Sequence, residues 1–428
     1  MKPLHFSIEV QAQDSYLYGG YIFFAMQDGN IVYLPMADVM HALFEKYPEY
    51  SSILKLAFSR NDYFSSAAGR LFMGIPMVNH AMKRAWIDAA ENTNFELRWY
   101  EVADHVKKIG TLNSPVLDMR LYAMNLYVGC KDGLYESKLN LQDDYHILPQ
   151  EPNRRFDAKT IALNSGYGTI IISAGKEGLF NAPLSDETNS ISVSDKADSS
   201  ISYRTGWSMS NLLNYEDSIN FEYLLNEMEK TNKRVGYSKF DSRGDNERIK
   251  ILGIKKIKSS DMVENLSIEK DDILYVFNSS QSSFIYSKDG IYVINLLSKD
   301  KGEYHLSSRT TKDSIYLGKR KKVEKPVSAT VVPAGCIIEF MNNVKLFQGG
   351  DIVTLENEPT FRVRSFMNSI RYRYLVASTK LKEVTIHSLE PFDTYESPLN
   401  RNAIRARYNH KPVGSYSNSS ETVDDLPF

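Results

Sequence analysis

Residues 126–135 read Leu-Tyr-Val-Gly-Cys-Lys-Asp-Gly-Leu-Tyr, and this order predicts a β-hairpin. Aromatic and β-branched residues suit the two strands, and an acidic residue followed by glycine suits a tight turn that needs a positive φ. The pattern returns as Lys-Glu-Gly-Leu-Phe at 176–180 and as Lys-Asp-Gly-Ile-Tyr at 288–292. Each copy follows an apolar run, and a leucine comes four residues after each copy. The hairpin is therefore a repeated unit.

A further strand precedes each hairpin, so that the unit is a meander of at least three antiparallel strands. Gly133 and Gly178 are 45 residues apart, which is the spacing of a β-propeller blade. Looser copies of the turn lie at Gly29, Gly69 and Gly349, with a degenerate hairpin at 211–219. Seven candidates predict an all-β fold, a single β-propeller of about seven blades with short helical insertions.

The stretch Leu126–Tyr135 resembles the blade signature of regulator-type β-propellers, in which a LYVGxxDGLY-like hairpin recurs. The resemblance covers three blades well and implies the fold but no activity, because propellers host enzymes, receptors and scaffolds alike. The Gly-His and Trp-Asp pattern of WD40 repeats is absent from the sequence.

Closure of the ring is expected to pair the strand at 4–10 with the strand at 383–389, because both alternate apolar and polar residues. Residues 1–407 are predicted to form the propeller, and residues 408–428, poor in apolar side chains, a disordered C-terminal tail. The competing architecture has two domains joined by the polar segment 185–202, which reads as a long exposed loop.

Three segments show helical spacing of apolar residues: 38–47, 80–90 and 221–230. The simpler interpretation is short inter-blade helices that pack on the rim. The alternative is a docking surface around Trp86 and Leu224.

A search for catalytic and metal-binding motifs is negative. The sequence lacks a nucleophile elbow, a His-Glu-x-x-His motif and a phosphate-binding loop. Only two cysteines are present, so a disulfide framework is excluded, and Cys130 is expected to be a buried apolar residue. No metal or cofactor is expected. Whether the chain is an enzyme stays open, leaning towards none, because residues from different blades can converge on the central channel.

The last third of the chain, 301–428, is the basic part, although the whole chain has a net charge of −2. Arginines at 362–373 interleave with Phe366, Tyr372 and Tyr374, which suits single-stranded nucleic acid or the outer face of an edge strand. The candidate partner-binding residues are Lys319, Arg320, Lys321, Lys322, Arg401, Arg405 and Arg407.

These observations favour a non-catalytic protein-interaction scaffold or sensor subunit of a larger complex, whose partner is another protein. One alternative is a propeller enzyme, a hydrolase or lyase, that acts at the channel mouth. Another is a nucleic-acid-associated subunit that uses the basic C-terminal third. The start of the sequence lacks the apolar stretch of a signal peptide, and no run is long enough for a membrane span, so a cytoplasmic location is expected.

Overall fold

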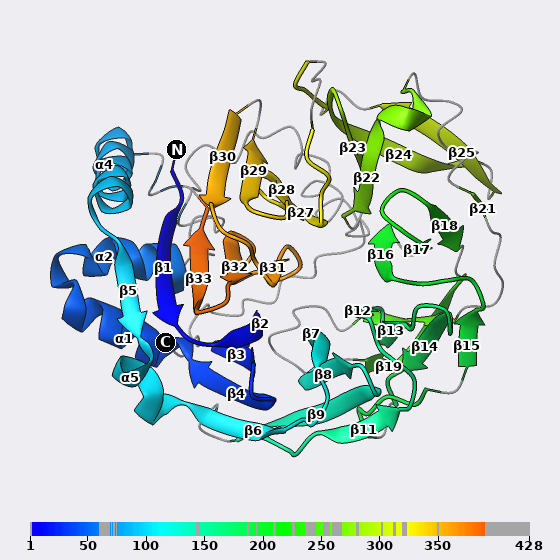
Figure 1. Cartoon of the computed structure of the whole chain (residues 1–428), viewed down its shortest axis with the longest axis horizontal. Coiled ribbons are helices and arrows are strands. Elements are labelled where there is room, and N and C mark those ends of the chain that lie inside the picture. Colours follow the sequence, from blue (N-terminus) through cyan, green and yellow to red (C-terminus); the bar gives the residue numbers. More distant parts are fainter. Residues whose placement is uncertain are drawn as a thin grey trace, which may run out of the picture.

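The computed structural model describes residues 2–389 except 60–68, 70, 72, 74, 143–145, 186–187, 194, 209–210, 225–226, 236–244, 251–256, 259–267, 280–281, 301–302, 311–313, 319–322 and 349–350. Over these residues, seven sheets of four or five strands are arranged in a ring around one axis (Figure 1). The protein is therefore a seven-bladed β-propeller, and the predicted fold is confirmed.

The first three blades follow one another along the chain, each with its innermost strand first. Blade 1 consists of β2 (Ala12–Tyr18), β3 (Tyr21–Met26), β4 (Asn30–Pro35) and β6 (Lys107–Thr111). Blade 2 consists of β7 (Val116–Tyr122), β8 (Asn125–Cys130), β9 (Leu134–Leu141), β10 (Ile147–Pro149) and β11 (Asn153–Phe156). Blade 3 consists of β12 (Ala162–Gly166), β13 (Thr169–Ser173), β14 (Leu179–Pro183) and β15 (Asp195–Asp198).

The next three blades keep this order. Blade 4 consists of β16 (Arg204–Ser208), β17 (Asn211–Tyr215), β18 (Phe221–Leu224) and β21 (Ile257–Lys258). Blade 5 consists of β22 (Ile273–Asn278), β23 (Ser283–Ser287), β24 (Gly290–Asp300), β25 (Glu303–Thr310) and β26 (Ile315–Tyr316). Blade 6 consists of β27 (Ser328–Val332), β28 (Gly335–Glu339), β29 (Val344–Gln348) and β30 (Asp351–Glu356).

Blade 7 joins the two ends of the described chain. Its strands are β31 (Arg362–Ser365), β32 (Leu375–Thr379), β33 (Glu383–Ser388), β1 (Leu4–Glu9) and β5 (Phe95–Arg98). The N-terminal strand β1 pairs antiparallel with β33, from Leu4 opposite Ser388 to Glu9 opposite Glu383. The predicted closure is confirmed, and β1 lies between β33 and β5 in the sheet of the last blade.

The three strong sequence copies occupy equivalent positions, the turn between the second and third strands of blades 2, 3 and 5. Their glycines share one requirement. A Cβ at any of these three glycines would overlap a backbone carbonyl oxygen of the next strand outward. The oxygens are those of Phe156 for Gly133, Asp198 for Gly178 and Ile315 for Gly290. A positive φ is found at Gly178 (+103°), but Gly290 has none. The repeated glycine is therefore required for the close approach of the fourth strand, and only partly for the turn.

The looser copies of the turn agree with the structure only in part. The turns at Gly29 and at 216–220 join the second and third strands of blades 1 and 4, as expected. The copy near Gly349 joins the third and fourth strands of blade 6 instead. The copy at Gly69 is wrong, because Gly69 is helical, and blade 7 has no copy at all. The false copy at Gly69 and the missed blade 7 cancel, so the predicted number of about seven blades agrees with the structure.

Two of the three predicted helices are confirmed. They belong to an insertion between β4 and β6, whose elements are α1 (Met36–Lys46), η1 (Pro48–Tyr50), α2 (Ser51–Leu54), a π-helical turn η2 (Lys55–Ser59), α4 (Pro76–Asn92), α5 (Trp99–Val102) and η4 (Ala103–His105). A short helix, η5 (Lys270–Asp272), precedes blade 5. Trp86 of α4 is fully buried and donates its indole N–H to the Lys2 carbonyl oxygen at 3.0 Å.

The helix predicted at 221–230 is wrong. Its first residues form β18, in which Phe221 is opposite Tyr215, and residues from Glu227 form β19 (Glu227–Val235), which pairs with β20 (Asp245–Lys250). Pairing with β17 overrides the helical spacing of the leucines, because a strand at this place completes the blade. Leu224 is fully buried, as Trp86 is, so neither belongs to the docking surface that the sequence suggested around them.

The exposed loop predicted at 185–202 is also wrong. Residues 195–198 form β15, the outer strand of blade 3, and Ile191 is buried in a bridge to Leu184. The segment is part of blade 3, so it cannot be the linker between two domains that the alternative architecture requires. The predicted tail, 408–428, lies outside the described residues.

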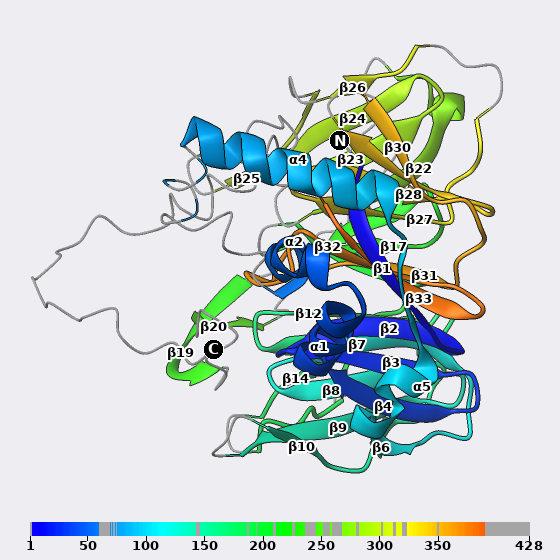
Figure 2. The same ribbon diagram turned by 90° about the vertical axis from the view of Figure 1, so that its left-hand side faces the viewer.

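The two faces of the ring differ. Because neighbouring strands within a blade run antiparallel, the turns between second and third strands lie on the same face as the starts of the innermost strands; we call this the short-turn face. The connections between third and fourth strands lie on the opposite face, the insertion face. Figure 2 shows α4 and the β19–β20 hairpin projecting on the same side of the molecule.

Candidate functional site

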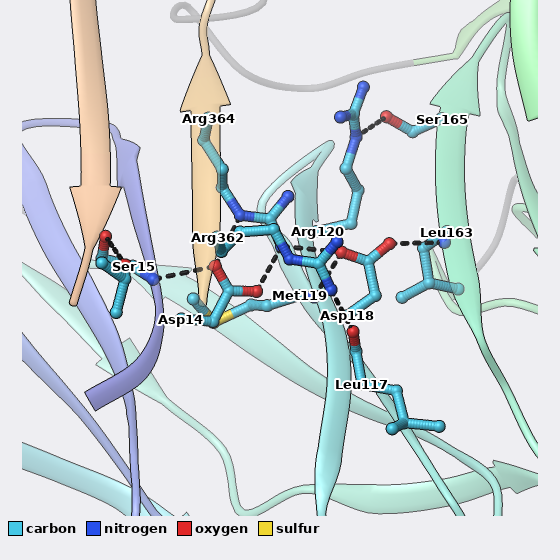
Figure 3. A network of polar contacts seen from close by, with 11 residues as sticks. Asp14, Ser15, Leu117, Asp118, Met119, Arg120, Leu163, Ser165, Arg362 and Arg364 are labelled. Atoms are coloured by element: carbon cyan, nitrogen blue, oxygen red, sulfur yellow. Dashed lines mark hydrogen bonds and ion pairs between the residues drawn. The ribbon is translucent and has the colours of Figure 1, made fainter. Parts of the chain in front are cut away.

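The innermost strands bring charged side chains together at the propeller axis, and these side chains are spread widely along the sequence. Asp14 lies on β2, Asp118 and Arg120 on β7, and Arg362 and Arg364 on β31. Figure 3 shows these five residues converging from blades 1, 2 and 7.

Arg364 is the centre of this group. Its Nε donates to Asp14 Oδ1 at 2.7 Å and its Nη2 to Asp118 Oδ1 at 2.7 Å, with a further contact to Asp14 Oδ2. Both acids are buried, and the arginine side chain is only 10% exposed. One guanidinium therefore joins three blades through charge-assisted hydrogen bonds.

Asp118 also ties blade 2 to blade 3. Its Oδ2 accepts a hydrogen bond from the backbone N–H of Leu163 at 2.6 Å, and its Oδ1 accepts one from Met119 N–H at 3.0 Å. Burial alone would raise the pKa of Asp118, but the charges of Arg364 and Arg362 and the bond from Leu163 lower it overall. The carboxylate is held ionised, which makes it a poor proton donor.

Further inner-strand bonds continue around the axis. Arg120 Nε donates to Ser165 Oγ of blade 3 at 3.0 Å, and the Asn164 amide donates to the Thr205 carbonyl of blade 4 at 3.1 Å. Arg204 of blade 4 is placed between the rings of Tyr215 and Tyr275, at 3.8 and 4.4 Å from their centroids. The contact of Arg204 with Tyr215 stays within blade 4, whereas the other three contacts cross a boundary between blades and hold neighbouring blades together.

Arg362 and Arg120 have N–H groups beyond those used in these bonds. Arg362 donates to the Leu117 carbonyl oxygen, and neither Arg362 nor Arg120 has a carboxylate partner among the described residues. Their remaining N–H groups can bind an anion or a carbonyl oxygen. In the described part of the chain, no group of three or more His, Cys, Asp or Glu residues is placed to hold a metal ion.

A second buried charged cluster lies at the ring closure. Glu356, the last residue of β30, accepts a hydrogen bond from His387 Nε2 at 2.8 Å and pairs with Lys380 Nζ at 2.8 Å. His5 of β1 is opposite His387 in the sheet, with 5.7 Å between the ring centroids. Burial raises the pKa of Glu356, but His387 and Lys380 outweigh it and lower the pKa to about 2. The cluster joins blade 6 to the closing sheet.

The structure revises the basic and aromatic stretch at 362–374. Phe366, Tyr372 and Tyr374 are buried, so their faces are not available for stacking on bases. Arg364 points to the axis, and of the four arginines only Arg371 is exposed. These three rings are therefore not a stacking surface for bases. The strand β31 is at the edge of its sheet, as the other interpretation had it, but Arg362 and Arg364 are not on an outer face, because β31 is the innermost strand of its blade.

The predicted partner-binding residues cannot be placed in the fold: Lys319, Arg320, Lys321, Lys322, Arg401, Arg405 and Arg407 all lie outside the described residues. The axial group was missed by sequence reasoning. Its signal was present, because Asp118 and Arg120 interrupt an otherwise apolar strand, and buried charges are uncommon unless they are paired. The partners, however, are hundreds of residues away.

No protein-family model matches the chain, and no curated protein matches it either. Among solved structures it is similar to the WD40 β-propeller domain of Doa1, with a TM-score of 0.40 and 9% identity over 91% of this chain and 93% of that chain. The β-propeller domain of Cps50 (Swd1) from Myceliophteria thermophila gives a TM-score of 0.46 and 9% identity over 89% and 97%. Sqt1 from Chaetomium thermophilum gives 0.38 and 10% over 64% and 69%. The similarity is one of propeller architecture alone.

Proposed function

We propose that the protein is a non-catalytic interaction scaffold or sensor subunit that binds another protein. The observation that carries this proposal is the use of the axial charges. Asp14 and Asp118 share one guanidinium, and backbone N–H groups bind both of them. In an enzyme of the hydrolase or lyase kind, an acid and a base need pKa values near the working pH and access to substrate. These two carboxylates instead hold neighbouring blades together through their bonds to Arg364.

The proposal is also supported by what lies away from the axis. Large insertions emerge on the insertion face, and several large apolar side chains are exposed on the short-turn face. Exposed apolar groups on a rigid scaffold are typical of protein-binding surfaces. In the described part of the chain, no helix is long and apolar enough to cross a membrane. A cytoplasmic location remains part of the proposal.

The test is affinity purification of the tagged full-length chain from its native host, with and without nuclease, followed by identification of bound proteins and nucleic acids. We expect a protein that copurifies in stoichiometric amount and survives nuclease treatment. Turnover of a small molecule by the purified chain, with no protein partner, would favour the alternative of an enzyme at the channel mouth. Loss of all partners on nuclease treatment would favour the nucleic-acid-associated subunit.

A further inference from the structure

The helix α4 packs on the blades mainly through its C-terminal half. Trp86, Ala89 and Ala90 are buried, and Trp86 donates its indole N–H to the Lys2 carbonyl oxygen at 3.0 Å. The first turns of α4 extend away from the blades on the insertion face (Figure 2). Met77 is 83% exposed there, so its side chain is not required for the core of the propeller.

Large apolar side chains gather at this end of the helix. Leu71 and Ile75, just before α4, are 77% and 49% exposed, and Ile87 of α4 is 37% exposed. With Met77 they place four large apolar side chains in contact with water within one short stretch. Such a group marks an interaction site more often than single exposed residues do. We name the described residues of 71–87 the α4 arm.

The α4 arm is also basic. It holds Lys83 and Arg84 and no acidic residue, because the two acids of α4, Asp88 and Glu91, follow it towards the buried end of the helix. Arg84 is exposed and forms no ion pair with any residue that the structure describes. In the sequence from 60 to 87, four Lys or Arg stand against one Asp, a net charge of +3. The arm therefore attracts an acidic segment.

The chain beyond blade 7 begins beside this helix. Ser388, the last residue of β33, is opposite Leu4, which is two residues after the Lys2 that binds Trp86. The Ser388 hydroxyl donates to the Ala57 carbonyl oxygen of η2 at 2.8 Å. Because β33 is the third strand of its blade, its end lies on the insertion face. The residues that follow β33 therefore start at the base of α4, on the side to which the arm extends.

The first segment after β33 has the opposite charge. Residues 390–400 lie outside the described residues, but their composition is read from the sequence. They hold three acids and no Lys or Arg, a net charge of −3: Glu390, Asp393 and Glu396. Their large apolar residues are Phe392, Tyr395 and Leu399. The segment thus combines the charge and the apolar groups that complement the α4 arm.

The segment is long enough to reach the arm. Its eleven residues span at most about 36–40 Å when extended. The helix rises only about 14 Å from Trp86 back to Met77. Because both belong to one chain, the effective concentration of the segment at the arm is on the order of 1 mM. A contact of modest affinity is therefore sufficient to hold it there.

We propose that residues 390–400 dock on the α4 arm of the same chain. The apolar side chains of the segment cover those of the arm, and its acids lie near Arg84. The contact goes beyond the proposed scaffold function, because it forms within the chain. It covers the arm in the free protein, and a partner that binds α4 has to displace the segment.

Disulfide trapping in the full-length chain tests this contact. Met77→Cys with Tyr395→Cys provides the two thiols, and Cys130 and Cys336 do not interfere, because both are buried. With oxidised glutathione, we expect this pair to form an intramolecular disulfide at least about tenfold faster than Glu91→Cys with Tyr395→Cys. Glu91 is exposed nearer the base of the same helix, so a freely moving segment would meet it at least as often. Mass spectrometry of the digested protein identifies the linked positions.

Charge reversal in the segment tests the electrostatic part. Asp393→Lys with Glu396→Lys, added to Met77→Cys and Tyr395→Cys, should slow trapping by at least about fivefold at low salt and less at high salt. Thr394→Ala with Ser397→Ala changes uncharged neighbours of these acids and is the matched control. It should leave the rate unchanged. The unfolding midpoint of each variant checks that the propeller is folded.

Equal trapping rates for the thiols introduced at positions 77 and 91 would overturn the proposal. So would a disulfide between two chains whose yield falls on dilution, since the occupant is then the segment of a second copy. Trapping of position 77 to a copurified protein in preference to position 395 would also overturn it. Affinity purification of the unmodified chain tests the scaffold function separately, so either proposal can fail without the other.

Discussion

Arg364 Nη2 lies 2.7 Å from Asp118 Oδ1, although 246 positions separate the two residues in the chain. The contact crosses from blade 7 to blade 2, and it forms only when the ring has closed through β1 and β33. The buried ion pair is thus a consequence of closure as well as a support for it.

Replacing Arg364 with methionine is expected to destabilise the protein by about 3–5 kcal/mol, because two buried carboxylates would lose their cation. Urea denaturation of the purified variant measures the change. Arg371→Met is the control, since Arg371 is exposed and its loss should cost within about 0.5 kcal/mol. Adding Asp14→Asn and Asp118→Asn to Arg364→Met should recover part of the stability. If Arg364→Met and Arg371→Met unfold at the same urea concentration, the axial network contributes nothing to stability.

The repeated glycine gives a second prediction. Gly133→Ala and Gly290→Ala should each lower the free energy of unfolding by more than about 1 kcal/mol, since a Cβ would overlap the carbonyl oxygen of Phe156 or Ile315. Lys131→Ala, an exposed change two residues before Gly133, serves as the control. Thermal or urea unfolding decides the matter. A stable Gly290→Ala variant would show that the outer strand can move away without cost.

Stability should fall as the pH falls. Burial, together with the nearby His387, lowers the pKa of His5 from 6.5 to about 4. Below pH 6.5 the unfolded chain therefore binds a proton at His5, whereas the folded chain binds it only below about pH 4. This difference lowers the free energy of unfolding by at most about 3 kcal/mol. Glu356, whose pKa is lowered to about 2, adds a second loss between about pH 4.5 and 2.

His5→Gln should flatten the stability profile between pH 6.5 and 4 and leave the lower fall in place. Glu356→Gln should act on the lower range and also cost stability at neutral pH, because Lys380 and His387 lose their partner. Urea midpoints measured across this range report both effects. His41→Gln, a change on the exposed part of α1, is the control. A profile that His5→Gln does not alter contradicts this account.

The two thiols should be unreactive in the folded protein. Burial, with the charge of Asp132, raises the pKa of Cys130 to about 12, and burial raises the pKa of Cys336 as well. Because the thiolate is the nucleophile, iodoacetamide should modify neither residue until the chain unfolds. Mass spectrometry with and without denaturant checks this expectation. Rapid labelling of native Cys130 would mean that blade 2 opens readily.

The basic clusters of the C-terminal third remain a prediction. If Lys319, Arg320, Lys321 and Lys322 act with Arg401, Arg405 and Arg407 on an acidic partner, reversing the four-residue run to Glu should weaken binding at low salt and little at high salt. Association rates at two salt concentrations measure the effect, with the unfolding midpoint as a check on folding. Unchanged affinity and salt dependence would leave the run a solvated loop.

The sequence by itself determined the repeating unit. Lys131–Tyr135 and its two copies specify a hairpin locally, because turn glycines and β-branched residues act over a few neighbouring positions. The alternation within 4–10 and 383–389 was enough to predict which strands close the ring. Local patterns misled at Phe221, whose helical spacing yields to pairing with Tyr215, and at Gly69, which is helical although the sequence around it resembles a hairpin turn.

Only the tertiary structure decided where the charges meet. Asp14, Asp118 and Arg364 lie on three different innermost strands, and no spacing along the chain reveals that these strands adjoin at one axis. The same holds for Met341 and Leu381, whose exposure follows from their place at turn tips rather than from their residue type. Short-range interactions specify a blade, whereas the order of blades around a closed ring, and hence the contacts between their inner strands, is a property of the whole chain.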